Sequence, residues 1–111
     1  MKAANFESVD KIVLVFRNSV DFDKEIIGYV PVTAEIKRFL ENNLDFGSAV
    51  SSFILIKPRV FTGTGVTYAQ QPLAAWDTED AMAYSIAASQ LFYVTQPTLE
   101  LQTAYKTNNP L

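Results

Sequence analysis

One stretch constrains the fold of this chain more than any other, the segment from Val50 to Thr62. It contains the run Phe53-Ile54-Leu55-Ile56, whose large apolar side chains point alternately to the two faces of an extended strand. A strand of this kind is buried on both faces, so the segment predicts a central strand. Pro58 follows, and proline has no backbone N–H to donate to a neighbouring strand. The second half of the strand is therefore predicted to lie at an edge, a bulge or a margin of the sheet.

The length and composition of the chain suit one hydrophobic core. With 111 residues, we expect a single globular domain spanning residues 1–111. A hydrophobic content of 49% with 19% charged residues is typical of folded proteins rather than disordered ones. The sequence has no apolar run long enough to cross a membrane and no signal-peptide pattern near Met1. We expect a soluble protein without a membrane partner, located in the cytoplasm, or in a virion if it is viral.

The absence of two residue types removes much of the chemistry that proteins commonly use. The chain has no histidine, so it lacks the usual general base near neutral pH and the commonest transition-metal ligand. It has no cysteine, which excludes disulfides, thiolate nucleophiles and cysteine-ligated zinc. A net charge of −3 argues against binding to a phosphate backbone. We therefore expect no cofactor, no metal site and no nucleic-acid partner.

The first half of the chain gives clear patterns of secondary structure. Apolar runs bounded by polar residues predict strands over Lys11–Arg17 and Ile26–Val30. A helix is predicted over Thr33–Asn43, with Thr33 as its N-cap. Its apolar stripe recurs at spacings of three and four residues and consists of Ile36, Phe39, Leu40 and Leu44.

The second half is harder to interpret. Glycines at 63 and 65 predict a hairpin over residues 63–68 that returns from the central strand. A second helix is predicted from Asp77 to about Ser89, and residues 91–94 fit either its end or a new strand. Residues 98–105 alternate between apolar and polar side chains, which predicts a strand with one wet face. The polar residues 106–111 are expected to form a tail that frays.

Together these elements predict an α+β fold, a small two-layer sandwich of a mostly antiparallel sheet and two helices. The predicted order is strand, strand, helix, strand, strand, helix, strand. Without its second strand, this order is similar to the βαββαβ arrangement of ferredoxin-like folds, in which two helices cover one face of the sheet. Folds of this kind support many unrelated functions, so function has to be argued from particular residues.

Two clusters of acidic residues are candidates for cation binding or proton transfer. They are Asp21, Asp23 and Glu25, and Asp77, Glu79 and Asp80. The first cluster lacks the loop glycine and the later glutamate of a calcium-binding loop, so a solvated turn explains it better. The second lies at a predicted helix start, where acids are favoured by capping and by the helix dipole. We assign neither cluster a catalytic or metal-binding role.

The remaining candidates are residues suited to a protein interface. Lys57 and Arg59 flank Pro58, where they could bind an anion or a carboxylate across an interface. They could instead protect a sheet edge from pairing, and this explanation is favoured. The stretch from Val66 to Trp76 is rich in side chains that occur at interfaces, although aromatic residues can also line the rim of a core. The candidate interface residues are Lys57, Arg59, Tyr68, Gln70, Gln71 and Trp76.

Two hypotheses of function follow. The first is a non-catalytic module for protein–protein interaction or assembly that binds a protein partner or itself. A homo-oligomeric subunit of a larger particle, such as a phage virion component, would have this character. The second is a small-molecule-binding protein or a histidine-independent acid/base enzyme, with a tyrosine and an acid in a pocket between the helices and the sheet. A buried carboxylate facing a tyrosine in a cavity of about 300 Å³ or more would favour the second hypothesis.

Overall fold

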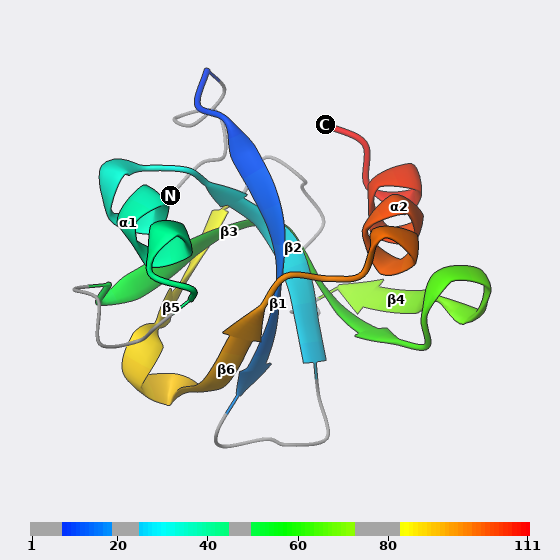
Figure 1. Ribbon diagram of the computed structural model, residues 1–111. Coiled ribbons are helices and arrows are strands. Elements are labelled where there is room, and N and C mark those ends of the chain that lie inside the picture. Colours follow the sequence, from blue (N-terminus) through cyan, green and yellow to red (C-terminus); the bar gives the residue numbers. More distant parts are fainter. Residues whose placement is uncertain (1–7, 19–24, 45–49, 73–82) are drawn as a thin grey trace.

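The computed structural model describes residues 8–18, 25–44, 50–72 and 83–111 (Figure 1). Within these ranges, six strands form one antiparallel sheet that is accompanied by two α-helices, which confirms the predicted α+β class. The elements in chain order are β1 (Lys11–Asn18), β2 (Glu25–Pro31), α1 (Ala34–Glu41), β3 (Ser52–Thr62), the 3-10 turn η2 (Gly65–Thr67), β4 (Ala69–Pro72), β5 (Ala83–Ala87), the 3-10 turn η3 (Ala88–Gln90), β6 (Leu91–Thr95) and α2 (Leu99–Asn108).

The predicted central strand, β3, lies in the interior of the sheet. The order of strands is β4-β3-β2-β1-β6, and β5 also pairs with β3. The first half of β3, residues 52–56, pairs with β5, and its second half, residues 59–62, pairs with β4. All of these pairs are antiparallel, and β2 runs along the other side of β3.

A bulge interrupts β3 at Lys57 and Pro58, between its contacts with β5 and β4. The register between β2 and β3 shifts here, so that these two residues stand opposite the single residue Gly28. Lys57 has a positive φ of 51°, and Pro58 is fully buried. Gly28 allows this close approach, because a Cβ atom there would lie 3.2 Å from Cδ2 of Leu55 and 3.4 Å from Cα of Pro58. Of the three settings that the sequence allowed for Pro58, the structure shows the bulge.

The bulge changes the face of the sheet to which the odd-numbered side chains of β3 point. Side chains alternate along a strand, so one extra residue moves every later side chain to the opposite face. Phe53 and Leu55, before the bulge, belong to the hydrophobic core on one face. Phe61, after the bulge, belongs to the core on the other face, although its number has the same parity. One strand thus contributes to two cores.

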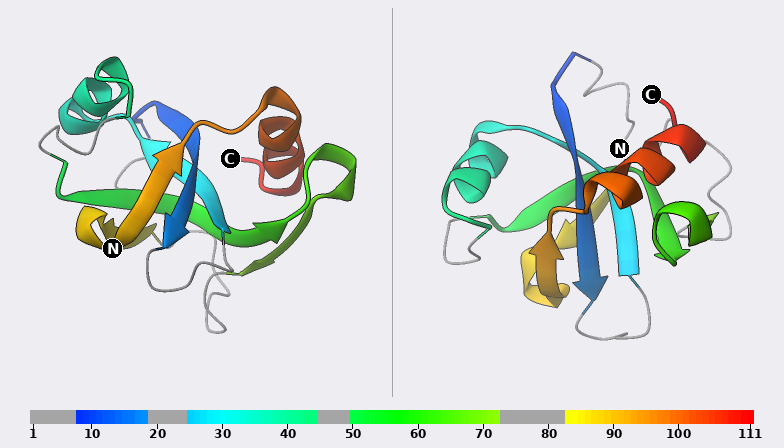
Figure 2. Two further views of the ribbon diagram at one scale, coloured as in Figure 1. Left: turned by 60° about the horizontal axis from the view of Figure 1, so that its bottom comes forward. Right: turned by 45° about the vertical axis from the view of Figure 1, so that its right-hand side comes forward.

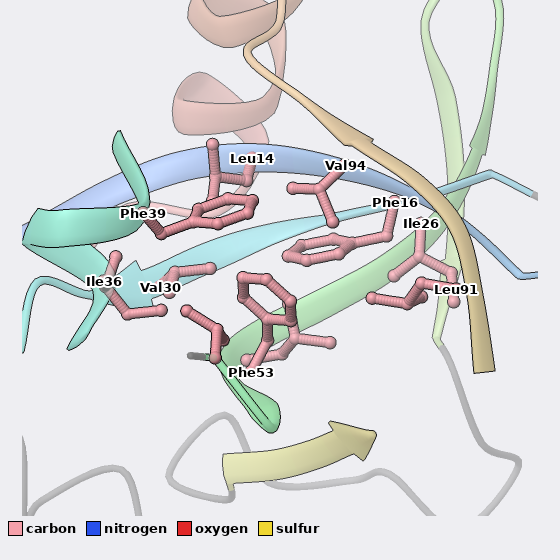
Figure 3. Packing of buried hydrophobic residues seen from close by; sticks show 11 residues of the cluster. Leu14, Phe16, Ile26, Val30, Ile36, Phe39, Phe53, Leu91 and Val94 are labelled. Atoms are coloured by element: carbon pink, nitrogen blue, oxygen red, sulfur yellow. The ribbon is translucent and has the colours of Figure 1, made fainter. Parts of the chain in front are cut away.

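The first core lies on one face of the sheet, between α1 and strands that include β6 (Figure 3). Helix α1 contributes Ile36 and Phe39, which the predicted stripe contains. The ring of Phe53 lies at the centre, with ring centroids 5.4 Å from Phe16 and 5.2 Å from Phe39 in edge-to-face arrangements. The remaining buried members come mainly from the strands and are Leu14, Ile26, Val30, Val50, Leu55, Leu91 and Val94.

The second core lies on the opposite face and is covered by α2. Helix α2 contributes Leu101 and Tyr105, and the strands contribute Val13, Val15, Ile27, Tyr29, Ile56, Phe61 and Ala83. Figure 1 shows α1 and α2 to either side of β1 and β2, and the two helices stay apart in both views of Figure 2, in agreement with the two separate cores. The expected arrangement, with both helices on one face, is therefore not the one observed.

The predictions for the first half of the chain are confirmed closely. Strands β1 and β2 occupy the expected segments and pair with each other. Helix α1 begins after Thr33, whose Oγ1 accepts a hydrogen bond from the backbone N–H of Ile36 at 3.5 Å. The predicted hairpin is formed by β3, η2 and β4.

The predictions for the second half need correction. Helix was expected from Asp77 to about Ser89, but residues 83–87 form β5 and the 3-10 turn η3 begins at 88, while residues 77–82 lie outside the described residues. Strand β5 forms because β3 offers it a complete pairing partner, which overrides the helix preference of its alanines. The ambiguous residues 91–94 are part of strand β6, which pairs with β1.

Residues 98–105 were expected to form a strand, but 99–108 form α2. The apolar residues that α2 buries, Leu101 and Tyr105, are four apart and share one helix face, whereas Leu99 is exposed. The last helix thus follows the last strand, so the order of elements differs from the ferredoxin-like one. Within the part of the chain that the structure describes, no helix has the length and apolar character needed to span a membrane.

Candidate interaction surface

Several of the candidate interface residues meet at the C-terminal end of α2. Asn109, only 3% exposed, lies at their centre. Its Nδ2 donates to Oε1 of Gln70 at 2.6 Å, and Nε2 of Gln70 donates to Oδ1 of Asn109 at 3.3 Å. The hydroxyl of Tyr68 donates to the same Oε1 atom at 2.8 Å. The polar ends of Tyr68 and Gln70 are therefore occupied by contacts within the chain.

Three further hydrogen bonds hold the C-terminal residues against the sheet. The hydroxyl of Tyr29 donates to the backbone oxygen of Asn109 at 2.6 Å, and that of Tyr105 donates to the backbone oxygen of Lys57 at 2.5 Å. Nζ of Lys57 donates to the backbone oxygen of Pro110 at 2.5 Å. Residues 106–108 complete α2, so the expectation of a fraying tail at 106–111 differs from this packed arrangement.

The tyrosines of this region are hydrogen-bond donors rather than bases. Burial raises the pKa of Tyr68 to about 12, although the charge of Arg59 opposes the shift. Burial also raises the pKa of Tyr105, with a further contribution from Tyr29, and it raises the pKa of Tyr29 itself. Each hydroxyl therefore keeps its proton at neutral pH.

The other candidate residues have different surroundings. Arg59 is half-buried and donates from Nη1 to the backbone oxygen of Pro58 at 2.9 Å. Gln71 is exposed on β4. Trp76 lies outside the described residues. The structure thus brings Lys57, Tyr68 and Gln70 together around the end of α2. Their role at an interface stays a prediction.

A row of side chains crosses the sheet below α2. Tyr93, Arg17, Glu25 and Phe61 occupy directly opposed positions on β6, β1, β2 and β3. Nη2 of Arg17 lies 2.9 Å from Oε1 of Glu25, and the hydroxyl of Tyr93 donates to Oε2 of Glu25 at 2.9 Å. The guanidinium of Arg17 also lies 5.5 Å from the centre of the Tyr93 ring. Burial raises the pKa of Tyr93, and the bond to Glu25 adds to this effect.

A groove of about 390 Å³ adjoins this row. Its lining residues are Glu25, Phe61, Thr62, Gly63, Thr64 and Leu101. This is a carboxylate facing a tyrosine beside a cavity, as the second hypothesis requires, but the carboxylate is not buried, because the Glu25 side chain is 33% exposed. Both of its oxygens already accept hydrogen bonds from Arg17 and Tyr93. Both oxygens of the carboxylate are therefore engaged by contacts within the chain, and a bound molecule would have to displace them.

The acidic clusters gain no support as metal sites. Asp21, Asp23 and all three acids of the second cluster lie outside the described residues. Among the residues that the structure describes, no three histidine, cysteine, aspartate or glutamate side chains come together.

Among the described residues, the two most exposed large apolar side chains lie where the turn η2 meets the first turns of α2, side by side in Figure 1. Val66 is fully exposed at 105%, and Leu99 is 79% exposed. A groove of about 530 Å³ lies between them. We refer to its lining residues as the tip patch, which consists of Gly65, Val66, Leu99, Glu100, Thr103 and Ala104.

The turn that carries Val66 has a fixed conformation. The backbone N–H of Thr64 donates to Oγ1 of Thr67 at 2.9 Å, and that hydroxyl donates back to the oxygen of Thr64 at 2.9 Å. Gly63 has a φ of 75°, and a Cβ atom there would lie 2.2 Å from the backbone oxygen of Thr67. The valine side chain is thus displayed to solvent by a closely packed turn.

Leu99 is not needed to start α2. The two helices begin with related sequences, Thr33-Ala34-Glu35-Ile36 and Thr98-Leu99-Glu100-Leu101, in which the threonine caps the helix and the fourth residue is buried. The second position is alanine in α1 and an exposed leucine in α2. The candidate stretch from Val66 to Trp76 contains Val66 but neither Leu99 nor Glu100. The repeated helix start is the signal that could have found them.

The comparisons with known proteins add no family to this description. No model of a known protein family matches the chain, and a search of curated proteins finds none with significant similarity to it.

Proposed function

We propose that this protein is a non-catalytic module for protein–protein interaction or assembly and that it contacts its partner through the tip patch. The observation that carries the proposal is the exposure of Val66 and Leu99 side by side around one groove. Single exposed apolar residues are common, but neighbouring ones that form a patch are typical of interaction sites. Because the turn that holds Val66 is already ordered, little conformational entropy is lost when a partner binds.

The tip patch is better suited to this role than the cluster around Asn109. There, the side chains of Tyr68 and Gln70 are committed to bonds within the chain, and a partner would have to break those bonds. At the tip patch, Val66 and Leu99 expose apolar surface that a partner can cover without such a cost. This favours contact at the start of α2 over contact at its end.

The proposal is tested by placing a photo-crosslinking amino acid at position 66 and, as a matched control, at the exposed position of Lys37 on α1. Irradiation in extracts of the cells that produce the protein should give one defined adduct from position 66 that the control does not give. Native mass spectrometry of the purified protein then shows whether a second copy can be the partner. Equal adduct patterns from the two positions would refute the proposal.

A second experiment separates binding from folding. Val66→Ser and Leu99→Ser change side chains that are already in solvent, so the free energy of unfolding should change by no more than about 0.5 kcal/mol. Both substitutions should weaken formation of the adduct or oligomer, measured with a crosslinker at a neighbouring patch position. Unchanged association in the double variant would contradict the proposal.

The alternative of a small-molecule-binding protein or acid/base enzyme is supported by the contact of Glu25 with Tyr93 beside the 390 Å³ groove. The ion pair with Arg17 weighs against it. The two functions are distinguished by native mass spectrometry, because a small molecule in the groove would appear as added mass that is lost in Glu25→Gln.

A further inference from the structure

We propose that the partner of the tip patch is a protein segment in which an aliphatic side chain stands next to a lysine or arginine. This inference rests on the proposed function and specifies the chemistry of the partner at the same surface. It commits to a basic segment of another protein rather than to a second copy of this chain.

The aliphatic part follows from the lining of the groove. Val66, Leu99 and Ala104 supply apolar surface. The hydroxyl of Thr103 donates to the backbone oxygen of Leu99 at 2.8 Å, so its polar hydrogen is already used inside the helix. A groove of about 530 Å³ has the size of a pocket for a small ligand and can admit an aliphatic side chain with its neighbours.

The basic part follows from Glu100, the one charged residue that lines the groove. Its Oε2 lies at the groove wall beside Gly65, where a Cβ atom on Gly65 would be 3.3 Å away. Among the described residues, the only ion pair joins Arg17 to Glu25. Glu100 takes part in none there. A cation next to the aliphatic side chain would therefore meet a carboxylate that is not ion-paired with any charged side chain of the described residues.

The charge of the whole chain favours a foreign partner. At −3, two copies repel each other, and a basic segment is attracted to both the chain and the groove. Occupation by a second copy is accordingly treated as a competing outcome of the experiment.

The chain offers a matched control for Glu100. Glu35 occupies the same position in the first turn of α1, also after a capping threonine, but it follows Ala34 instead of an exposed leucine. Glu35→Gln therefore removes the same charge from an equivalent helix start without touching the tip patch.

The experiment titrates the isotope-labelled protein with two blocked tetrapeptides, glycine-leucine-lysine-glycine and glycine-leucine-glutamate-glycine. Nuclear magnetic resonance follows the backbone amides of Val66, Leu99 and Glu100. The lysine peptide should shift these amides more strongly than the glutamate peptide. Glu100→Gln should weaken binding of the lysine peptide about threefold, as expected for an exposed ion pair, while Glu35→Gln leaves it unchanged.

The outcomes separate this inference from the proposed function. Equal binding of the two peptides, or unchanged binding in Glu100→Gln, would overturn the inference even if position 66 still gives its crosslink. Shifts of the same amides on raising the protein concentration alone would identify a second copy as the occupant and would also overturn it. The proposed function fails separately, if position 66 gives no adduct that the control at position 37 lacks.

Discussion

The hydroxyl of Tyr105 donates a 2.5 Å hydrogen bond to the backbone oxygen of Lys57, the residue of the β3 bulge that has a positive φ. This contact joins the last helix to the irregular point of the central strand. Tyr105 is fully buried, and its ring lies 5.0 Å from that of Tyr29, whose hydroxyl binds Asn109. Helix α2 is thus held by polar contacts as well as by its apolar face.

Tyr105→Phe should lower the free energy of unfolding by about 1–3 kcal/mol, because it leaves the oxygen of Lys57 without this donor in a part-buried site. Urea denaturation followed by circular dichroism measures the change. Tyr93→Phe serves as the control, since Tyr93 is only half-buried and water can replace its hydroxyl. Equal losses in the two variants would show that the bond at the bulge has no special weight.

The protein should lose stability as the pH rises from about 10 towards 12. The pKa of Tyr68 is about 12 in the folded protein, above the value near 10 of an exposed tyrosine, so the unfolded chain releases its proton first. The contribution is complete below about pH 10 and is lost as the pH rises through the folded pKa. Unfolding measured at several alkaline pH values should show a shallower decline in Tyr68→Phe. An equally steep decline would exclude Tyr68 as a cause.

Gly28→Ala should destabilise the fold by about 1–3 kcal/mol through overpacking. The added Cβ atom would lie 3.2 Å from Cδ2 of Leu55, which is fully buried and has little room to move. Thermal and urea unfolding measure the loss, and the same substitution in a Leu55→Ala background should cost less because the contact is gone. A stability unchanged by Gly28→Ala would mean that the bulge tolerates a side chain.

The helix caps give a matched pair of substitutions. Thr98 accepts from the backbone N–H of Leu101 at 3.3 Å, and Thr33 accepts from that of Ile36 at 3.5 Å. Thr98→Ala and Thr33→Ala should each cost about 0.5–2 kcal/mol, while serine at either position should retain most of the stability. Equal stability of the alanine and serine variants would show that these contacts do not cap the helices.

The elements that the sequence predicts well are those whose pattern allows a single interpretation. The stripe of Ile36 and Phe39 fits only a helix, and the run Phe53–Ile56 is continuous enough to require a strand with two buried faces. Pro58 also carries a local signal, because its missing N–H limits the positions it can occupy.

The errors arise where one pattern satisfies two periods. Leu101 and Tyr105 are four residues apart, which suits one face of a helix and also one face of a strand. Leu99, whose apolar character completes the strand pattern, is exposed and belongs to neither core. For β5, the deciding factor is its pairing with Ser52–Ile56, which no local sequence contains.

The contacts of the candidate interface residues also involve residues far away in the sequence, which a local pattern does not show. Gln70 was selected for its position in a polar and aromatic stretch, but its partner Asn109 lies 39 residues further along the chain. The exposure of Val66 and Leu99 likewise depends on a hairpin and a helix that meet only in the folded chain.

The bulge in β3 has a consequence for how the sequence can vary. Deleting one of its two residues would do more than shorten a strand, because Phe61 would turn from the α2 side to the α1 side of the sheet. Substitutions within one core, by contrast, leave the alternation intact and act on one side only. Single-residue insertions and deletions in β3 should therefore be far less tolerated than changes of side chain, and the length of this strand should be the most strictly preserved property of the chain.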